Sequence, residues 1–193
     1  MDSEKHACQK CRGCCKFEED ELYFAPLFTK AEVEKIKAKV SCNASSAKKA
    51  KPSLNAAFHL YKNSDKVFQV ELIKSEDDPK LWVCPFLDEK THLCSIYSER
   101  NLDCRLWPFI FMNSKKGEVV LAHFDRDMCP IWNEMKEEDF LKVKQRMVLM
   151  LEEEEIVQTL REHPELAWEY EQYTTVISTH RIGKASVAAV QTF

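Results

Sequence analysis

The stretch HACQKCRGCCKF, residues 6–17, holds four of the nine cysteines of the chain within eight positions. These are Cys8, Cys11, Cys14 and Cys15. Thiols crowded in this way form disulfides, hold a metal or carry out redox chemistry. Each interpretation predicts a different organisation of the surrounding chain, so the rest of the sequence has to decide between them.

Length, charge and cysteine count argue against disulfides. A chain of 193 residues can bury a core without covalent cross-links, and nine cysteines leave one over in any complete pairing. The start MDSEKHACQK lacks the apolar segment of a secretory signal, and no apolar run approaches the roughly 20 residues that span a bilayer. We therefore expect a cytoplasmic protein with reduced thiols and no membrane segment.

The other cysteines extend the pattern. Cys84, Cys94 and Cys104 are spaced ten residues apart, and Cys129 follows in a second Cys-Pro pair. Cys42 alone lies in a polar stretch without a neighbouring cysteine, so we expect it to be dispensable for metal binding. Eight thiols in clusters favour a soft metal, because thiolates select zinc and iron–sulfur centres over calcium and magnesium.

The spacing favours an iron–sulfur cluster of the 4Fe-4S type. Cys8, Cys11 and Cys14 form C-x2-C-x2-C, which places three sulfurs of one loop around a cluster. The fourth ligand would come from far along the chain, and Cys84-Pro85 and Cys129-Pro130 are candidates. Cys15 would point away from Cys14 in extended backbone, so we do not expect these two to share one ion.

Zinc is the alternative metal, because Cys8 and Cys11 supply one CxxC pair and the later cysteines are compatible with a β-hairpin. A mononuclear iron site or redox thiols also stay open. The net charge of −4 predicts no general affinity for nucleic acid or anionic membranes. The expected partners are a metal ion or cluster and a protein partner, with no nucleic acid and no membrane.

Sequence periodicity predicts an α+β fold. The stretch 29–40 is predicted to be a helix with Thr29 as N-cap and Glu32 completing a capping box, followed by a loop over 41–53. Alternating apolar residues predict strands, and these make a small, mostly antiparallel sheet with cysteines at its turns. The predicted strands cover 66–73, 81–87, 93–97 and 117–124.

The period changes near residue 134. Apolar residues at helical spacing predict helices through about 175, with Phe140, Val143, Met147 and Met150 on one face. We accordingly expect a cysteine-cluster metal-binding domain at 1–132 and a helical extension packed on it at 133–193.

The cysteine pattern resembles a known family. The segments CQKCRGCC, CPFLDEKTHLCSIYSERNLDCRLWPF and a last CP are similar to the signature of the cysteine-cluster (CxxCxxCC) family of zinc- or iron-chelating domains. The resemblance runs from Cys8 to about Pro130. One departure is Asn101, where the family commonly has proline; we expect this to affect a turn and not a ligand.

The resemblance implies that this is a metal-binding protein with an eight-cysteine ligand set. Those residues are Cys8, Cys11, Cys14, Cys15, Cys84, Cys94, Cys104 and Cys129. Flagellin lysine methylases carry a similar cysteine pattern, which makes an enzyme related to lysine methyltransferases an alternative. With three glycines in the chain, no glycine-rich cofactor loop supports that alternative.

The remaining polar candidates have ordinary structural interpretations. Arg100 and Arg105 flank Cys104 and would balance thiolate charge, or else form surface ion pairs. Tyr97 is expected in the core, and His6, His92 and His123 are weak ligand candidates.

Because no nucleophile–base arrangement is evident, the chain carries no clear sign of being an enzyme. We favour a metal or iron–sulfur protein in a redox, metal-handling or enzyme-supporting role. The alternatives are an enzyme and a zinc-stabilised protein-interaction module.

Overall fold

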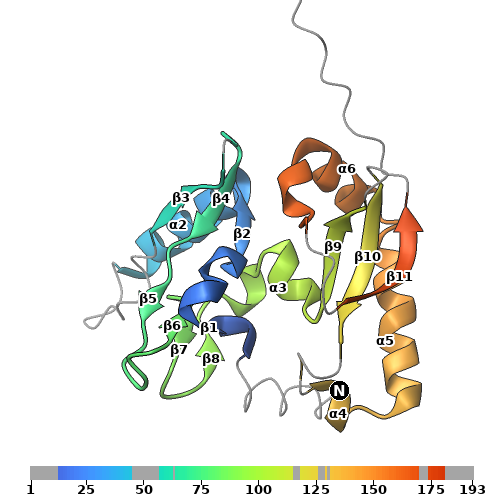
Figure 1. The fold of residues 1–193 in the computed structure, drawn as a ribbon. Coiled ribbons are helices and arrows are strands. Elements are labelled where there is room, and N and C mark those ends of the chain that lie inside the picture. The colour runs from blue at the N-terminus through green and yellow to red at the C-terminus, as the bar shows by residue number, and fades with distance from the viewer. Residues whose placement is uncertain are drawn as a thin grey trace, which may run out of the picture. The chain divides into compact units, whose positions relative to one another are not determined.

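The computed structural model describes residues 13–44, 57–62, 64–114, 118–125, 129, 131–169 and 174–180 (Figure 1). The structural statements below concern these residues. The chain divides into two compact units, Met1–Trp107 (unit 1) and Pro108–Phe193 (unit 2). The predicted boundary at 132/133 separates a metal-binding region from an extension and stays a prediction; the compact units divide earlier, at 107/108.

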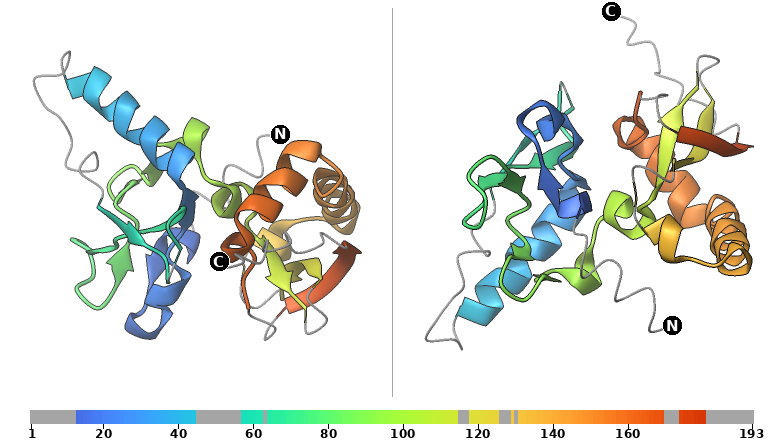
Figure 2. Two further views of the ribbon diagram at one scale, coloured as in Figure 1. Left: turned by 90° about the horizontal axis from the view of Figure 1, so that it is seen from above. Right: turned by 60° about the horizontal axis from the view of Figure 1, so that its bottom comes forward.

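Unit 1 contains a three-stranded antiparallel sheet of order β2-β4-β3, covered by helix α2 (Figure 2). The elements are β2 (Leu27–Thr29), α2 (Lys30–Ala44), β3 (Phe58–Leu60) and β4 (Val67–Val70). The predicted capping box is confirmed, because the Thr29 amide donates to Glu32 Oε2 at 2.8 Å and the Glu32 amide donates to Thr29 Oγ1 at 3.3 Å. Helix α2 extends to Ala44, so residues 41–44, predicted as loop, are helical.

A second three-stranded sheet and a hairpin carry the cysteines of unit 1. The sheet has the order β1-β6-β5, and β7 pairs with β8. The elements are η1 (Gly13–Cys15), β1 (Lys16–Phe17), η2 (Glu19–Phe24), β5 (Ile73–Lys74), β6 (Trp82–Val83), β7 (Leu87–Asp88), β8 (Leu93–Cys94), η4 (Tyr97–Glu99) and α3 (Leu102–Leu106). The predicted strand 66–73 is two strands in different sheets, β4 and β5.

The core of unit 1 lies between these sheets and α2. It contains Phe28 and Phe86, both 1% exposed, whose rings meet edge to face with centroids 6.1 Å apart. Val33 and Ile36 bury one face of α2, which agrees with the predicted apolar positions. Cys84 belongs to this core, and Cys15 and Cys94 pack against it half-buried. The cysteines therefore lie at the edge of the unit 1 core.

Unit 2 is a three-stranded antiparallel sheet of order β11-β10-β9 with helices against it. The elements are β9 (Phe109–Asn113), β10 (Val119–Phe124), α4 (Ile131–Glu134), α5 (Glu137–Met150), α6 (Glu154–Glu162), η6 (Pro164–Leu166) and β11 (Thr174–His180). Strands β9 and β10 are apolar on both faces and almost entirely buried, and helix α5 lies against β11 (Figure 1).

The α+β prediction is confirmed, with four small sheets among the described residues instead of one. The predicted helices after residue 134 are confirmed as α5 and α6. Ile156 and Leu160 of α6 are buried. The extension is not purely helical, because Thr174–His180 forms β11, which completes the sheet through pairing with β10. Within the described part of the chain, no helix has the length and apolarity to cross a membrane.

Candidate metal centre

Cys15 and Cys84 are brought together by the ladder between β1 and β6. Lys16 pairs with Val83 and Phe17 with Trp82, so Cys15 and Cys84 are the next residues at one end of this ladder. The Cys84 amide donates to the Cys15 carbonyl at 2.9 Å. Strand pairing therefore joins the amino-terminal cysteine cluster to a cysteine 69 positions later in the chain.

Cys94 is placed by the tight hairpin β7–β8, where it pairs with Leu87. Asp88 closes the turn, because its Oδ1 accepts from the amides of Lys90 and Thr91 at 3.1 and 3.0 Å. His92 adopts φ = 56°, a left-handed conformation that is uncommon for a residue with a Cβ. The turn reverses the chain two residues before Cys94 and returns it toward Cys84.

Cys104 lies on the short helix α3 and is held by Asn101. The Asn101 side chain is the N-cap of α3, and its Oδ1 accepts from the Cys104 amide at 3.3 Å. Its Nδ2 donates to the Leu27 carbonyl at 2.5 Å, and Asp103 accepts from the Leu27 amide at 3.4 Å. Asn101 is fully buried and ties the cysteine-bearing helix to the first residue of β2.

Cys84 and Cys104 interact electrostatically with each other and with the thiols of Cys14 and Cys94. Burial raises the pKa of the Cys84 thiol to about 12; a hydrogen bond from the Phe86 amide opposes this rise, and the charges of Cys94 and Cys14 add to it. The pKa of Cys104 is raised well above its ordinary value, first by burial and then by Cys84, Cys14, Asp103 and Cys94. The four thiols come from η1, the end of β6, β8 and α3.

The expectation that Cys14 and Cys15 diverge is wrong. Their Sγ atoms lie 4.0 Å apart, because Gly13–Cys15 forms a 3-10 turn and not extended backbone. The two thiols are hydrogen-bonded to each other, and either sulfur can be the donor.

The other predicted ligands lie in unit 2 or outside the described residues. Cys129 belongs to unit 2, where it is buried and its carbonyl accepts from the Trp132 amide at 3.1 Å. Cys8 and Cys11 lie outside the described residues, as does the side chain of Cys42. Among the side chains that the structure describes, no three His, Cys, Asp or Glu are already arranged to hold a metal ion.

The arginines beside Cys104 differ from each other. The guanidinium of Arg100 stacks on the Tyr97 ring at 4.0 Å and donates to the Cys104 carbonyl at 3.4 Å, while its buried Nε has no hydrogen-bond partner. Arg105 is exposed. No cation is among the groups that shift the pKa of Cys84 or Cys104. The proposed charge compensation by these arginines thus gains no support from the structure.

The aromatic and histidine candidates also differ in their burial and contacts. Tyr97 is 59% exposed on η4, so its expected place in the core is wrong. Phe109 is buried, and His123 packs edge to face against Phe109, Trp132 and Phe140. His123 Nδ1 lies 2.9 Å from the Phe124 carbonyl oxygen, which accepts a hydrogen bond from that nitrogen. His6 lies outside the described residues.

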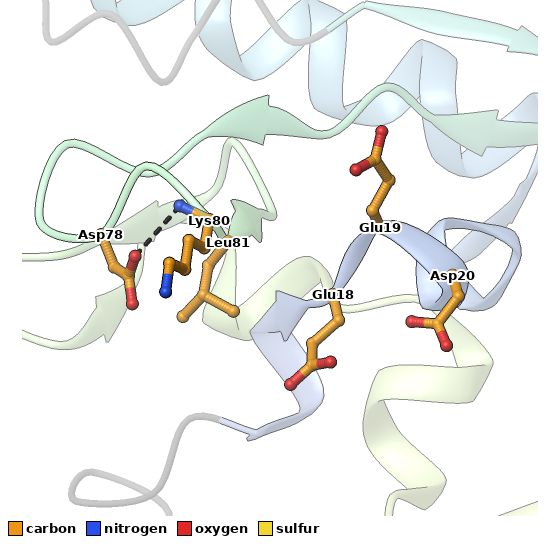
Figure 3. A pocket seen from close by; sticks show the side chains of 6 residues that line it. All are labelled: Glu18, Glu19, Asp20, Asp78, Lys80 and Leu81. Carbon is orange, nitrogen blue, oxygen red and sulfur yellow. Dashed lines mark hydrogen bonds between the residues drawn. The ribbon is translucent and has the colours of Figure 1, made fainter.

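An open hollow of about 540 Å³ lies at the other end of the β1–β6 ladder (Figure 3). Its lining residues are Glu18, Glu19, Asp20, Asp78, Lys80 and Leu81. Asp78 accepts from the Lys80 amide at 3.0 Å, and this bond shapes the rim (Figure 3). The hollow is acidic and lined by oxygen groups, so it differs chemically from the thiol group at the Cys15–Cys84 end.

Two features of the site were missed by sequence reasoning. Asn101 was assigned to a turn, although its position three residues before Cys104 is a recognisable N-cap signal. The Phe86 amide that hydrogen-bonds the Cys84 thiol was also missed. The Cys-Pro-Phe order was its only signal, because proline at position 85 makes residue 86 the next available donor.

Comparison with known proteins supports the same part of the chain. Residues 7–146 match the family CxxCxxCC, described as “Putative zinc- or iron-chelating domain”. No curated protein and no solved structure matches the chain. The match covers more than half of the sequence and includes all eight patterned cysteines, so this protein belongs to the CxxCxxCC family of zinc- or iron-chelating domains.

Proposed function

We propose that unit 1 binds one zinc or iron(II) ion through the thiolates of Cys14, Cys84, Cys94 and Cys104. The support for this proposal is that Cys84 and Cys104 interact electrostatically with each other and with Cys14 and Cys94, although the four cysteines lie on separate elements of unit 1. Four cysteine sulfurs are the complete ligand set of a closed tetrahedral zinc site. The same set suits iron(II), since soft thiolates bind both metals.

Electrostatics favours a cation at this position. The groups that raise the pKa of Cys104 after burial are all acids, namely three thiols and Asp103. Ionising several of these thiols without a counter-charge is costly, because Cys84 is buried and the other three cysteines are half-buried. A divalent cation removes that cost, because metal binding deprotonates its ligands and neutralises their charge.

The hydrogen bond from the Phe86 amide to Cys84 supports a ligand role for this thiol. Amides that donate to a ligating sulfur stabilise its charge and fix its direction. Asn101 has the corresponding role for the backbone of Cys104.

The thiols must draw together when the ion binds, because no three are yet arranged to hold it. Rotating a cysteine side chain between staggered rotamers moves its sulfur by about 3 Å. We expect such rotations to bring the four sulfurs to the ion when it binds.

We favour a single ion over a 4Fe-4S cluster because four thiolates complete a tetrahedral site without inorganic sulfide. In a cubane each cysteine binds a different iron. The cluster stays the alternative that the C-x2-C-x2-C spacing suggests. Roles for Cys8, Cys11 and Cys129 in a second centre are part of the same alternative.

Metal analysis tests the proposal. We expect anaerobically purified protein to contain about one zinc or iron per chain without acid-labile sulfide, as a single mononuclear site requires. Cys104→Ser is expected to lose the ion and Cys42→Ser to keep it. Absence of metal from the wild-type protein, or full metal content in the Cys104 variant, would contradict the proposal.

A measurement without substitutions covers the case in which Cys104→Ser does not fold. Titration of the wild-type apoprotein with Co²⁺ is expected to produce the visible bands of tetrahedral cobalt and the ultraviolet bands of thiolate ligation. A brown protein with broad absorption near 400 nm and acid-labile sulfide would instead establish the iron–sulfur alternative.

A further inference from the structure

We infer that Cys14 and Cys15 form a redox site, at which a low-molecular-weight disulfide oxidises the two thiols to a reversible disulfide between neighbouring residues. The inference goes beyond the proposed function, because no step of the reaction involves a metal ion. It gives the turn that carries these cysteines a chemistry that the description of the family, zinc or iron chelation, does not assign.

The first observation is the contact between the two sulfurs. Cys14 Sγ and Cys15 Sγ lie 4.0 Å apart and are hydrogen-bonded to each other. Both residues belong to the 3-10 turn Gly13–Cys15, which keeps the second thiol beside the first without help from a distant part of the chain. A group held next to its reaction partner in this way reacts far faster than the same group free in solution.

The second observation is that a small reagent can reach the pair. Cys14 and Cys15 are half-buried, whereas Cys84 and Cys129 are buried. Reactive cysteines are characteristically those that keep some exposure to solvent. The Cys15 carbonyl accepts from the Cys84 amide at 2.9 Å, and Cys15 packs against the core of unit 1. The structure therefore holds the pair in place and leaves it partly open to solvent.

A disulfide between adjacent residues is strained, which makes it reversible. Consecutive Cα atoms lie about 3.8 Å apart across a trans peptide bond. Disulfides usually join Cα atoms that are about 4.4–6.8 Å apart, and departures from this range make the bond easier to reduce. Strained or exposed disulfides are the labile and regulatory ones. The pair is therefore suited to reversible oxidation and not to permanent cross-linking of the fold.

The oxidation conserves atoms and electrons. The thiolate of one cysteine attacks a sulfur of the small disulfide RSSR, a mixed disulfide forms, and RS⁻ leaves and takes up the proton that the attacking thiol lost. The neighbouring sulfur then attacks the protein sulfur of this mixed disulfide. The bond between Cys14 and Cys15 forms, and the second RS⁻ leaves and takes up the second proton. Two protein thiols lose two electrons in all, and RSSR is reduced to two RSH.

The sequence allows a direct test, because trypsin cleaves after Arg12 and Lys16, and the peptide 13–16 contains Cys14, Cys15 and no other cysteine. The full chain is incubated with excess glutathione disulfide and a chelator, which prevents a bound ion from protecting the thiols. Free thiols are then alkylated and the protein is digested. We expect mass spectrometry to find this peptide without alkylation and lighter by two hydrogens than its dithiol form. Reduced glutathione should restore both thiols.

Single substitutions separate the two steps of the reaction. In Cys14→Ser and Cys15→Ser the mixed disulfide has no adjacent sulfur to resolve it, so each variant should retain glutathione on its remaining thiol of peptide 13–16. Cys42→Ser is the matched control, and it should form the same internal disulfide as the wild-type protein. Peptide mapping of the three variants uses the digestion already described.

Several outcomes would overturn the inference. They are a doubly alkylated peptide 13–16 in the wild-type protein, a disulfide from this peptide to another cysteine, and a bond that reduced glutathione leaves closed. Absence of glutathione from peptide 13–16 in both single variants would also overturn it. The proposed function is tested separately by the metal content of the reduced protein, so either one can fail without the other.

Discussion

The two units of the molecule differ in the length and burial of their strands. The strands around the cysteines in unit 1 have only two residues each, and the segment from Cys84 to Cys104 consists of turns, a hairpin and short helices. In unit 2, β9 and β10 are five and six residues long and almost continuously buried. The comparison indicates that unit 2 is stabilised by its apolar core, and we expect the cysteine-bearing part of unit 1 to need additional cross-linking by a metal.

The largest expected effect is that of metal removal, which should loosen part of unit 1 and leave unit 2 unchanged. In apoprotein, we expect amide protection to fall over 84–104 and to persist in β9, β10, α5 and α6. A ligand at 100 times its dissociation constant stabilises by about 2.7 kcal/mol, so protection in the first segment should fall on the order of 100-fold. The same loosening is predicted for 6–17. Hydrogen exchange measures both regions at once, and equal protection in both forms would show that metal does not hold the hairpin.

Removing core volume from unit 2 should destabilise unit 2 without affecting metal binding by unit 1. Leu121 on β10 is fully buried. Leu121→Ala should lower the free energy of unfolding of unit 2 by about 2–5 kcal/mol, through lost burial and the cavity left behind. Metal content should stay unchanged. Chemical denaturation followed by circular dichroism, together with metal analysis, checks this, and loss of metal would contradict the independence of the two units.

Within unit 1, substitution of Asn101 tests whether the cap on α3 positions Cys104. Asn101→Ala removes the cap on the Cys104 amide and leaves the Leu27 carbonyl without its side-chain donor. The expected cost in stability is about 1–3 kcal/mol, with weaker metal binding because α3 is no longer fixed. Asn101→Ser keeps a capping oxygen and should lose less. Competition with a chelator measures the affinity, and equal affinities in both variants and the wild type would remove the positioning role.

A surface ion pair should matter less. Lys39 Nζ lies 2.6 Å from Glu99 Oε1, and the hydrogen bond from Lys39 lowers the pKa of the Glu99 carboxyl. A carboxyl with a lowered folded-state pKa stabilises the fold above its ordinary value of 4.5, and this stabilisation disappears as the pH falls through the lower folded-state value. Glu99→Gln should thus reduce Tm slightly at pH 7 and not at pH 3. A difference that persists at pH 3 would assign the effect to packing.

The smallest effect is expected from Cys42→Ser, which tests whether the group of ligands is complete without this residue. Cys42 lies in the last turns of α2 and outside the family's cysteine pattern. Its replacement should leave metal content and hydrogen exchange of 84–104 unchanged. Metal loss in this variant would mean that the ligand set had been assigned incorrectly.

Much of the fold follows from local sequence signals. The capping box of Thr29 and Glu32 and the helices α5 and α6 were predictable, because capping and helical periodicity act within a few residues. The split of residues 66–73 between two sheets was not, because a continuous apolar alternation does not reveal which neighbour each half pairs with. Strand β11 was missed for the same reason, since its partner β10 lies about 50 residues earlier.

The sequence by itself determined the family and the thiol chemistry, because both depend on which residues are present and on their spacing. Only the tertiary structure decided which thiols meet. The β1–β6 ladder joins Cys15 to Cys84, and the hairpin and the Asn101 cap place Cys94 and Cys104. Such pairings depend on long-range hydrogen bonds and burial, which spacing along the chain does not encode.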